Sequence, residues 1–483
     1  MKLNKLIAVA AAVLALAACN KQEDPELLTS APSLTFEAVG GMQTFGINSN
    51  VDWTITVADG DGWVTVNPMS GEGNETVTVT TSAYEEAAGR SARLTISGGD
   101  LVQTVAVIQT RPAVPADPSV LEYKVQAREQ DLTVEVPAGF AYKVTIPSEA
   151  TYVTVKETTK ENVTLHFAAN TTDENRSADI LIQTSDDLTL ETIKTVQSWR
   201  NVEPGELLIE EVFFTGALIE STNTSDTSEG DQYFKLTNNA DHTVYADGVL
   251  LVLGFHNSNA ATTGANYTYP ELTDEIPVGT VYAIPGKGTD VPVEPGQSIV
   301  IAMAAENFAK DNPNGVDLSG ADFELYDEND FFPDTDNPDV ANMNCWFKSS
   351  FTITGLHNRG MESYAIAIAP NSVTAESFME NYKWEGKRVM DWNGYHFEND
   401  IRDGYKIPNA WVLDGINCGV AEQLIRLAFN ASVDAGWTGV SETQDDATRY
   451  GKTVIRKAKD GKLADTNNST NDFEVSTTPS LKK

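Results

Sequence analysis

Runs in which apolar and polar residues alternate dominate the first two hundred residues of the chain. Such runs lie close together at residues 51–57, 63–66, 76–80, 93–97 and 105–109. Alternation with a period of two places one face of a strand against a core. Between the runs, residues 67–73 contain proline and two glycines, which favour turns. Closely spaced strands of this kind predict a β-sandwich.

The same order of strands recurs about 87 residues later. Arg176-Ser177-Ala178 repeats Arg90-Ser91-Ala92, and a glutamine ends the last strand in both copies. A repeat of this length indicates a duplicated module. Residues 112–118 contain three prolines and predict a semi-rigid linker between modules at 33–111 and 119–200.

From residue 205 onward the loops are longer and aromatic residues are more frequent. Strand patterns occur at residues 207–214, 232–238, 249–253, 298–302, 364–368, 411–413 and 453–455. Only the stretches 375–382 and 420–430 have helical spacing. The sequence therefore predicts a mainly β protein, with tandem immunoglobulin-like β-sandwiches and a larger C-terminal β-domain at 205–483 that carries a few short helices.

The amino terminus has the pattern of a signal peptide. Two lysines precede an apolar run, residues 6–18, that is too short to span a bilayer. The run ends in Leu-Ala-Ala before Cys19, which resembles the lipobox of bacterial lipoproteins. The resemblance implies a signal peptide at 1–18, lipid on Cys19 and a polar tether at 19–32. The alternative is an ordinary secretory peptide.

An acidic pair, Glu23 and Asp24, follows this cysteine closely. A pair at this offset resembles the export signal of Bacteroidetes surface lipoproteins. The resemblance implies a lipid-anchored protein of the outer membrane, displayed at the cell surface, although a solvated linker explains the same residues. No later apolar run reaches about 18 residues, so the lipid on Cys19 is the expected membrane anchor.

Composition narrows the class of protein further. The chain has 483 residues and 41% hydrophobic residues, which excludes wholesale disorder and favours several domains. It carries 33 Lys and Arg against 70 Asp and Glu, a net charge of −37. Such a surface repels phosphate groups, so we expect no nucleic-acid partner.

Chemical motifs are sparse. The five histidines show no metal-ligand spacing, and no nucleophile or phosphate-loop motif is present, so we expect no enzyme and no cofactor. Asp334, Asp336 and Asp339 could wrap a calcium ion, or they could belong to a solvated acidic loop. Cys345 and Cys418 could form a disulfide in an oxidising compartment, or they could be separate buried thiols.

Aromatic residues concentrate between residues 382 and 411, interleaved with polar ones. Rings beside polar groups suit the recognition of a sugar or a peptide, because rings supply contact area at low entropic cost. The alternative is a covering flap that packs its rings onto the domain. The candidate ligand-binding residues are Trp384, Trp392, Tyr395, Tyr405 and Trp411.

Two regions of the chain resemble known families. Residues 33–110 are similar to the BACON domain, a Bacteroidetes module named for proposed carbohydrate binding. The similarity rests on Trp53-Thr54-Ile55, on the run 62–71, on Arg90-Ser91-Ala92 and on Val107-Ile108-Gln109. The second module is a degenerate copy, with Tyr152 where the tryptophan is expected. The resemblance implies β-sandwiches, in which Trp53 and Trp63 are expected to be core residues.

The C-terminal region resembles a lamin-tail-like immunoglobulin domain with insertions. The matching segments are residues 209–212, 236–238, 294–296 and 465–473. Within that class it is similar to an uncharacterised domain of Bacteroidetes lipoproteins that accompany TonB-dependent uptake systems. The resemblance implies a non-catalytic accessory that binds a glycan or peptide. The alternatives are an assembly subunit of a TonB-dependent transporter or of another surface lipoprotein, without a ligand of its own, and an unrecognised hydrolase.

Overall fold

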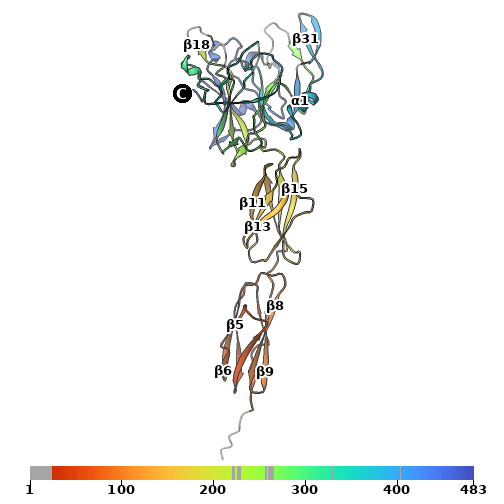
Figure 1. Cartoon of the computed structure of the whole chain (residues 1–483), viewed down its shortest axis with the longest axis vertical. Coiled ribbons are helices and arrows are strands. Elements are labelled where there is room, and N and C mark those ends of the chain that lie inside the picture. The colour runs from red at the N-terminus through yellow and green to blue at the C-terminus, as the bar shows by residue number, and fades with distance from the viewer. Residues whose placement is uncertain are drawn as a thin grey trace, which may run out of the picture.

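The computed structural model describes residues 24–219, 224–225, 230–255, 258, 266–327, 331–402 and 404–483. They form three β-rich bodies in series, with the C-terminal domain at the end of the molecule opposite the amino terminus (Figure 1). The predicted mainly β class is confirmed, because the described residues hold only two α-helices, α1 (Ala375–Asn381) and α2 (Ser469–Asp472). Neither is long and apolar enough to cross a bilayer.

The first sandwich packs two sheets against each other. One contains, in order, β1 (Leu27–Thr29), β3 (Gly41–Ser49), β7 (Glu75–Thr81) and β5 (Val64–Asn67). The other contains β2 (Ser33–Phe36), β9 (Leu101–Gln109), β8 (Arg90–Gly98), β4 (Asp52–Ala58) and β6 (Ser70–Glu72). Leu27 is buried, so the sandwich begins there and not at residue 33. Trp53 lies in the core, as predicted, and Trp63 is half-buried.

The second sandwich repeats this strand order. Its first sheet contains β10 (Ser119–Val125), β16 (Thr189–Gln197), β15 (Arg176–Gln183) and β12 (Lys143–Thr145). Its second sheet contains β11 (Gln130–Glu135), β14 (Asn162–Phe167) and β13 (Val153–Thr158). In each module one early strand runs parallel to the last strand of the module, β2 to β9 in the first and β10 to β16 in the second. This shared topology is what the sequence repeat predicts.

An arginine and a glutamine form the same contact in both sandwiches. Nε of Arg90 donates to Oε1 of Gln109 at 2.9 Å, and Nε of Arg176 donates to Oε1 of Gln197 at 2.9 Å. Each guanidinium also stacks on a ring, 4.3 Å from its centroid in the first module and 4.0 Å in the second; the rings are those of Trp63 and Tyr152. Tyr152 therefore takes the place of the missing tryptophan.

The C-terminal domain packs a seven-stranded sheet on a six-stranded one. The first contains β28 (Ala341–Asn342), β27 (Phe323–Glu324), β26 (Ser298–Ala302), β20 (Tyr233–Asn238), β17 (Leu207–Phe213), β35 (Thr453–Arg456) and β38 (Phe473–Ser476). The second contains β29 (Asn344–Lys348), β24 (Glu275–Ala283), β22 (Val249–Gly254), β30 (Tyr364–Ile368) and β34 (Val412–Ile416), with β33 (Tyr405–Pro408) paired to β24.

Shorter elements of this domain lie outside the two large sheets. Two-stranded pairs are formed by β18 (Leu218–Ile219) with β19 (Thr224–Ser225), β21 (Val244–Tyr245) with β25 (Pro292–Val293), and β36 (Ala458–Lys459) with β37 (Lys462–Leu463). Single 3-10 turns are η1 (Phe308–Lys310), η2 (Asn409–Trp411), η3 (Ala421–Gln423) and η4 (Ala447–Arg449).

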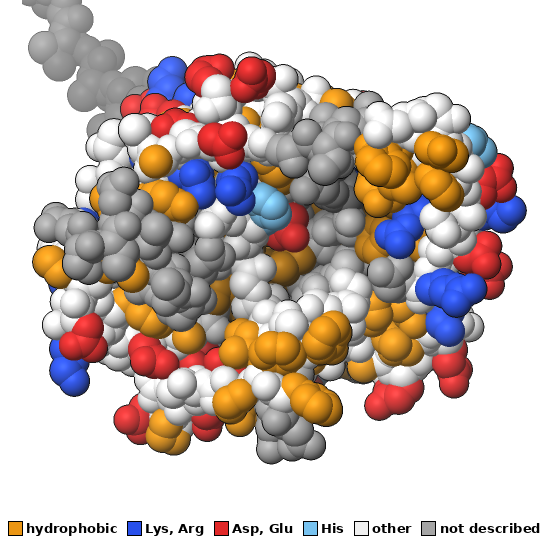
Figure 2. Space-filling view, turned by 90° about the horizontal axis from the view of Figure 1, so that it is seen from above, with side chains coloured by type: hydrophobic (Ala, Val, Ile, Leu, Met, Phe, Trp, Pro, Cys, Tyr) orange, Lys and Arg blue, Asp and Glu red, His pale blue; other side chains and the backbone are white. Residues whose placement is uncertain are grey.

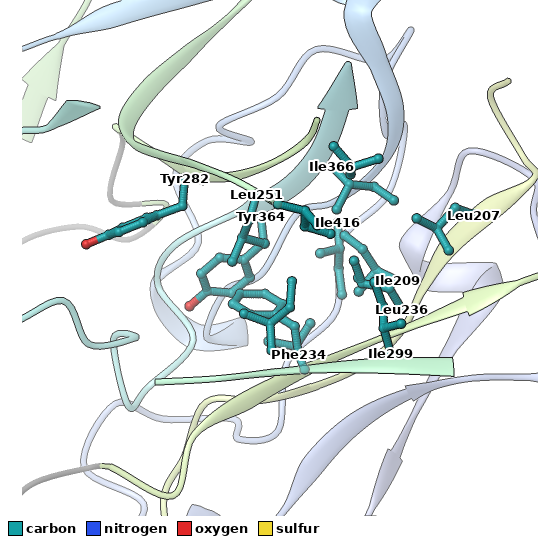
Figure 3. Packing of buried hydrophobic residues seen from close by; sticks show 14 of the residues in the cluster. Leu207, Ile209, Phe234, Leu236, Leu251, Tyr282, Ile299, Tyr364, Ile366 and Ile416 are labelled. Carbon is teal, nitrogen blue, oxygen red and sulfur yellow. The ribbon is translucent and has the colours of Figure 1, made fainter. Parts of the chain in front are cut away.

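Side chains from both sheets meet in one apolar core (Figure 3). Ile209 and Leu236 come from the seven-stranded sheet, and Leu251 and Ile366 come from the six-stranded sheet; all four are fully buried. Burying apolar area contributes roughly 25 cal/mol per Å². The contact between the sheets is therefore the main source of the domain's stability.

The helix predicted at 375–382 is confirmed by α1, but the helix predicted at 420–430 is wrong. Only η3 forms in that stretch. The backbone groups of residues 420–430 bond to distant residues instead. The amide of Ile425 donates to the carbonyl of Ser258, and the amide of Phe429 donates to the side chain of Asn417. These tertiary hydrogen bonds replace those of a helix.

A buried ion pair joins the two sheets. Nη2 of Arg456, on β35, donates to Oδ2 of Asp414, on β34, and both side chains are almost fully buried. Ile209 of β17 completes the link, because its amide donates to Asp414 at 2.7 Å and its carbonyl accepts from Nε of Arg456 at 2.9 Å. Burial raises the pKa of Asp414 to about 6, and the opposing charge of Arg456 limits that rise.

We expect Arg456→Met to destabilise the C-terminal domain by about 3–5 kcal/mol, because it leaves the buried carboxylates of Asp414 and Asp472 without their cation. The double variant Arg456→Met/Asp414→Leu should cost less than the single variant. Calorimetric unfolding of the full chain measures both, with the transitions of the two sandwiches as internal controls. A double variant that is less stable than the single variant would contradict this role.

Candidate functional site

A three-stranded sheet projects from the end of the C-terminal domain (Figure 1). It consists of β23 (Asn266–Thr268), β31 (Lys387–Trp392) and β32 (Tyr395–Asp400). The two residues between β31 and β32, Asn393 and Gly394, both have positive φ, at 50° and 81°. This is the backbone of a tight two-residue hairpin turn, which asparagine and glycine adopt most readily.

One face of this hairpin is aromatic. Trp392 lies opposite Tyr395 and Met390 lies opposite Phe397, so all four side chains share a face. Trp392 and Phe397 are each 41% exposed, and Tyr395 is 65% exposed. Figure 2, which looks down on this end of the molecule, shows hydrophobic side chains grouped at the surface beside charged ones. We call Trp392, Tyr395 and Phe397 the aromatic face.

The other face of the hairpin is charged. Nδ1 of His396 lies 2.7 Å from a carboxylate oxygen of Asp391, and Nζ of Lys387 lies 2.9 Å from Glu398. The hydrogen bond to Asp391 raises the pKa of His396, and the hydrogen bond from Lys387 lowers the pKa of Glu398. These four groups therefore pair with one another on the face turned away from the rings.

Trp384, predicted to bind ligand, is a packing residue at the base of the projecting sheet. It is only 2% exposed, and its ring stacks on Tyr269 at 5.8 Å and meets Phe255 edge-on at 5.6 Å. Its burial among rings leaves no face for a ligand. The prediction for this residue is therefore corrected.

Tyr405 and Trp411 are corrected for the same reason. The ring of Tyr405 lies 4.1 Å from that of Phe347, and the ring of Trp411 lies 4.8 Å from that of Tyr382. Both side chains are buried in the second core of the domain. Of the five candidate rings, the structure brings only Trp392 and Tyr395 together at the surface.

A second exposed aromatic cluster was not predicted. Phe331 is 85% exposed and Phe351 is 74% exposed, and the ring of Phe332 lies 5.9 Å from that of Phe351. We call these three residues the phenylalanine patch. The adjacent Phe331 and Phe332 inside an acidic run are the sequence signal that could have revealed this patch. Apolar residues within a strongly charged segment are not expected to reach the core, so they indicate an exposed apolar surface.

The three candidate calcium ligands do not converge. Asp334 accepts the backbone N–H groups of Asp327 and Thr335, at 3.0 and 2.9 Å, and Asp336 accepts the side-chain amide of Asn342 at 2.8 Å. Across the described residues, no group of three acidic, histidine or cysteine side chains could hold a metal ion. The calcium prediction at Asp334, Asp336 and Asp339 is therefore wrong for the part of the chain that is described.

The predicted disulfide is also wrong. Cys345 and Cys418 are both free thiols, the first exposed and the second buried. Cys345 lies on β29, whereas Cys418 follows β34, at the opposite edge of the same sheet. Four strand spacings separate these edges by about 19 Å, and a disulfide needs Cα atoms within about 7 Å. Cys19, the predicted lipidation site, lies outside the described residues.

Two family models match parts of the chain. Residues 52–110 match BACON, described as "Putative binding domain, N-terminal", and residues 294–480 match DUF4876, described as "Protein of unknown function". The first match confirms the BACON resemblance of the first sandwich. The lamin-tail resemblance of the C-terminal domain stays a prediction. No curated protein matches the chain.

Several solved structures are similar to parts of the chain. A DUF4876 family protein from Bacteroides thetaiotaomicron VPI-5482 is 20% identical, with 74% of this chain and 95% of that one covered and a TM-score of 0.42. The Bacteroides ovatus GH5 xyloglucanase in complex with a XXXG heptasaccharide is 27% identical over 20% of this chain and 22% of that one, with a TM-score of 0.18. These TM-scores are too low to carry an argument about function.

We expect substitution of a buried ring and of an exposed ring to change the stability of the domain by different amounts. Trp384→Ala should lower the unfolding free energy of the C-terminal domain by about 3–5 kcal/mol, because it empties a packed site. Trp392→Ala should change it by no more than about 0.5 kcal/mol, because the ring is at the surface. Denaturant unfolding of the full chain measures both, and equal losses would show that the hairpin rings are structural.

Proposed function

We propose that this chain is a lipid-anchored, non-catalytic binding protein of the outer membrane that contacts a glycan or peptide at the cell surface through the aromatic face. The observation that carries the proposal is the row of exposed rings, Trp392, Tyr395 and Phe397, on a tightly turned hairpin. This hairpin lies at the end of the molecule that is farthest from the amino terminus. The BACON match, to a family described as a binding domain, supports a binding role.

The chemistry of the hairpin suits recognition. Aromatic rings bury large areas and stack on the apolar faces of sugar rings or on apolar side chains, and few torsions are lost. Water leaves these rings when a ligand covers them, which contributes roughly 25 cal/mol per Å² of apolar area. The charged groups, His396 and Glu398 among them, lie on the opposite face, where only a ligand that wraps the edge of the hairpin would reach them.

In this proposal the two sandwiches act as a spacer between the lipid and the C-terminal domain. At their junction the amide of Ala141 donates to the carbonyl of Glu85 at 2.8 Å, and Nζ of Lys160 lies 2.8 Å from the carboxylate of Glu85. Arg111 also pairs with Asp186, at 3.1 Å. Exposed ion pairs are each worth about 1 kcal/mol or less, but together with the backbone bond and the proline-rich linker they favour one orientation.

A second candidate function is assembly with a TonB-dependent transporter or another surface lipoprotein. The phenylalanine patch favours it, because exposed aromatic side chains grouped in this way are typical of protein–protein contacts. The two functions differ in which patch they use. A reaction is not part of either proposal, and measured turnover of glycans or peptides would contradict both.

We expect Trp392→Ala/Tyr395→Ala to weaken retention on a panel of glycans and peptides at least tenfold, because two stacking rings are lost. Phe351→Ala, which removes an equally exposed ring elsewhere, is the matched control and should leave retention unchanged. Loss of co-purifying partner proteins in Phe351→Ala, with ligand retention unaffected by the hairpin variant, would favour the assembly function instead.

We expect Cys19→Ser to release the protein from the membrane fraction, because several acyl chains on that cysteine are the proposed anchor. Fractionation of cells, with mass spectrometry of the amino-terminal peptide, measures both the location and the lipid. An unacylated wild-type peptide would contradict the anchor and leave the binding role to be judged by the hairpin variants alone.

A further inference from the structure

The outer edge of β32 is open along its whole length. β32 pairs with β31 on one side only and is the last strand of the three-stranded projecting sheet (Figure 1). All six of its residues are exposed. Within the described residues, no backbone–backbone hydrogen bond joins this strand to anything outside its own sheet. An edge of this kind is a template on which another strand can form.

Alternate residues of β32 point their backbone groups outward. The two-residue turn makes Trp392 and Tyr395 a hydrogen-bonded pair, and such pairs recur at every second residue of an antiparallel ladder. The amide of Ile401 donates to the carbonyl of Gly386 at 2.9 Å, which continues the same series. The residues whose N–H and C=O groups therefore face away from β31 are His396, Glu398 and Asp400.

β32 lacks the features that protect other edge strands of this chain. β13, at an edge of the second sandwich, carries Lys156 and a bulge between Val155 and Glu157, and both discourage the addition of a strand. β32 contains neither lysine nor proline, and its register with β31 runs over all six pairs without a bulge. A regular edge of this length matches an ordinary β-strand.

The two faces of the sheet beside this edge differ in chemistry. Tyr395 and Phe397 belong to the aromatic face, so every second side chain of an added strand would lie beside an exposed ring. The remaining side chains would lie beside Glu398 and Asp400. On that charged face three acidic residues are accompanied by one lysine and one histidine. A strand with alternating apolar and basic side chains therefore fits both faces.

We propose that an extended peptide with alternating apolar and basic residues adds to the edge of β32 as a fourth strand. Backbone hydrogen bonds to His396, Glu398 and Asp400 provide affinity, and the exposed rings select apolar side chains. This addition rests on the proposed function, since it uses the aromatic face, and it specifies the ligand as a peptide. A second copy of this chain fits less well, because each copy carries a net charge of −37 and brings the same carboxylates.

Peptides with blocked backbone amides test the addition without any change to β32. The probe is a synthetic eight-residue peptide in which valine and lysine alternate, titrated calorimetrically into the full chain carrying Cys19→Ser. The backbone amides of its lysines face β32 in an antiparallel addition, and those of its valines do so in a parallel one. We expect N-methylation of one set to weaken binding about tenfold or more, and N-methylation of the other set to leave it unchanged.

The charge of the peptide is tested in the same way. A peptide in which valine and glutamate alternate should bind about tenfold more weakly than the lysine peptide, because the acidic chain repels it. Equal affinity for the two peptides would overturn the choice of a basic ligand. Weakening by neither N-methylated set, or equal weakening by both, would overturn strand addition.

Variants of the chain locate the binding edge. Glu398→Pro removes an outward N–H group and leaves the bonds to β31 in place, so it should weaken peptide binding about tenfold or more. Glu398→Gln, which keeps that N–H group and loses only the charge, should weaken binding by no more than about threefold. The matched control Glu157→Gln, an exposed residue of another edge strand, should leave binding unchanged.

The hairpin variant Trp392→Ala/Tyr395→Ala separates strand addition from the proposed function. Peptide binding that this variant loses and Glu398→Pro retains would overturn strand addition and leave the aromatic face as the site. Binding that Glu398→Pro loses and the hairpin variant retains would support strand addition and contradict the role of the rings. No binding of the unmodified peptide, or dimerisation of the chain that Glu398→Pro abolishes, would overturn the peptide as the occupant.

Discussion

A buried ion pair between Arg456 and Asp414 aligns the two sheets whose apolar contact stabilises the C-terminal domain. It fixes β35 of one sheet to β34 of the other, and Ile209 bonds to both partners. Such a pair is costly to desolvate and stabilises only when every partner is in place, so it specifies one alignment of the two sheets. These two aligned sheets form the rigid scaffold that carries the aromatic face.

The aromatic face is held in position by its attachment to this scaffold. Trp384 anchors the hairpin, because its ring packs against those of Tyr269 and Phe255. The tip of the hairpin is exposed to water. Binding residues are commonly carried on loops and hairpins that a rigid scaffold positions. The same residue type therefore has two roles within ten positions, since Trp384 anchors the sheet and Trp392 faces solvent.

Sequence patterns predicted the strands well where apolar and polar residues alternate, as in β4, β7 and β8. They missed β24, which pairs with β22, β29 and β33 in the six-stranded sheet, because Pro277 and Gly279 interrupt its apolar run and are rare inside strands. The ion pair could not be predicted, because Arg456 and Asp414 lie 42 residues apart in an acidic chain that offers many partners.

The candidate site was predicted only in part. The aromatic concentration drew attention to Trp392 and Tyr395, but spacing alone could not show that Tyr405 and Trp411 point into a core. The Asn393-Gly394 pair between two aromatic residues is a hairpin signal that would have separated the tip from the rest.

Protection of side chains on ligand binding tests the role of the aromatic face most directly. Hydroxyl-radical footprinting of the displayed protein, with and without the retained glycan or peptide, reports the exposure of each ring. We expect Trp392, Tyr395 and Phe397 to become protected when ligand is added, while buried Trp384 stays unchanged. Ligand retention without any protection of these three rings would contradict the proposed function.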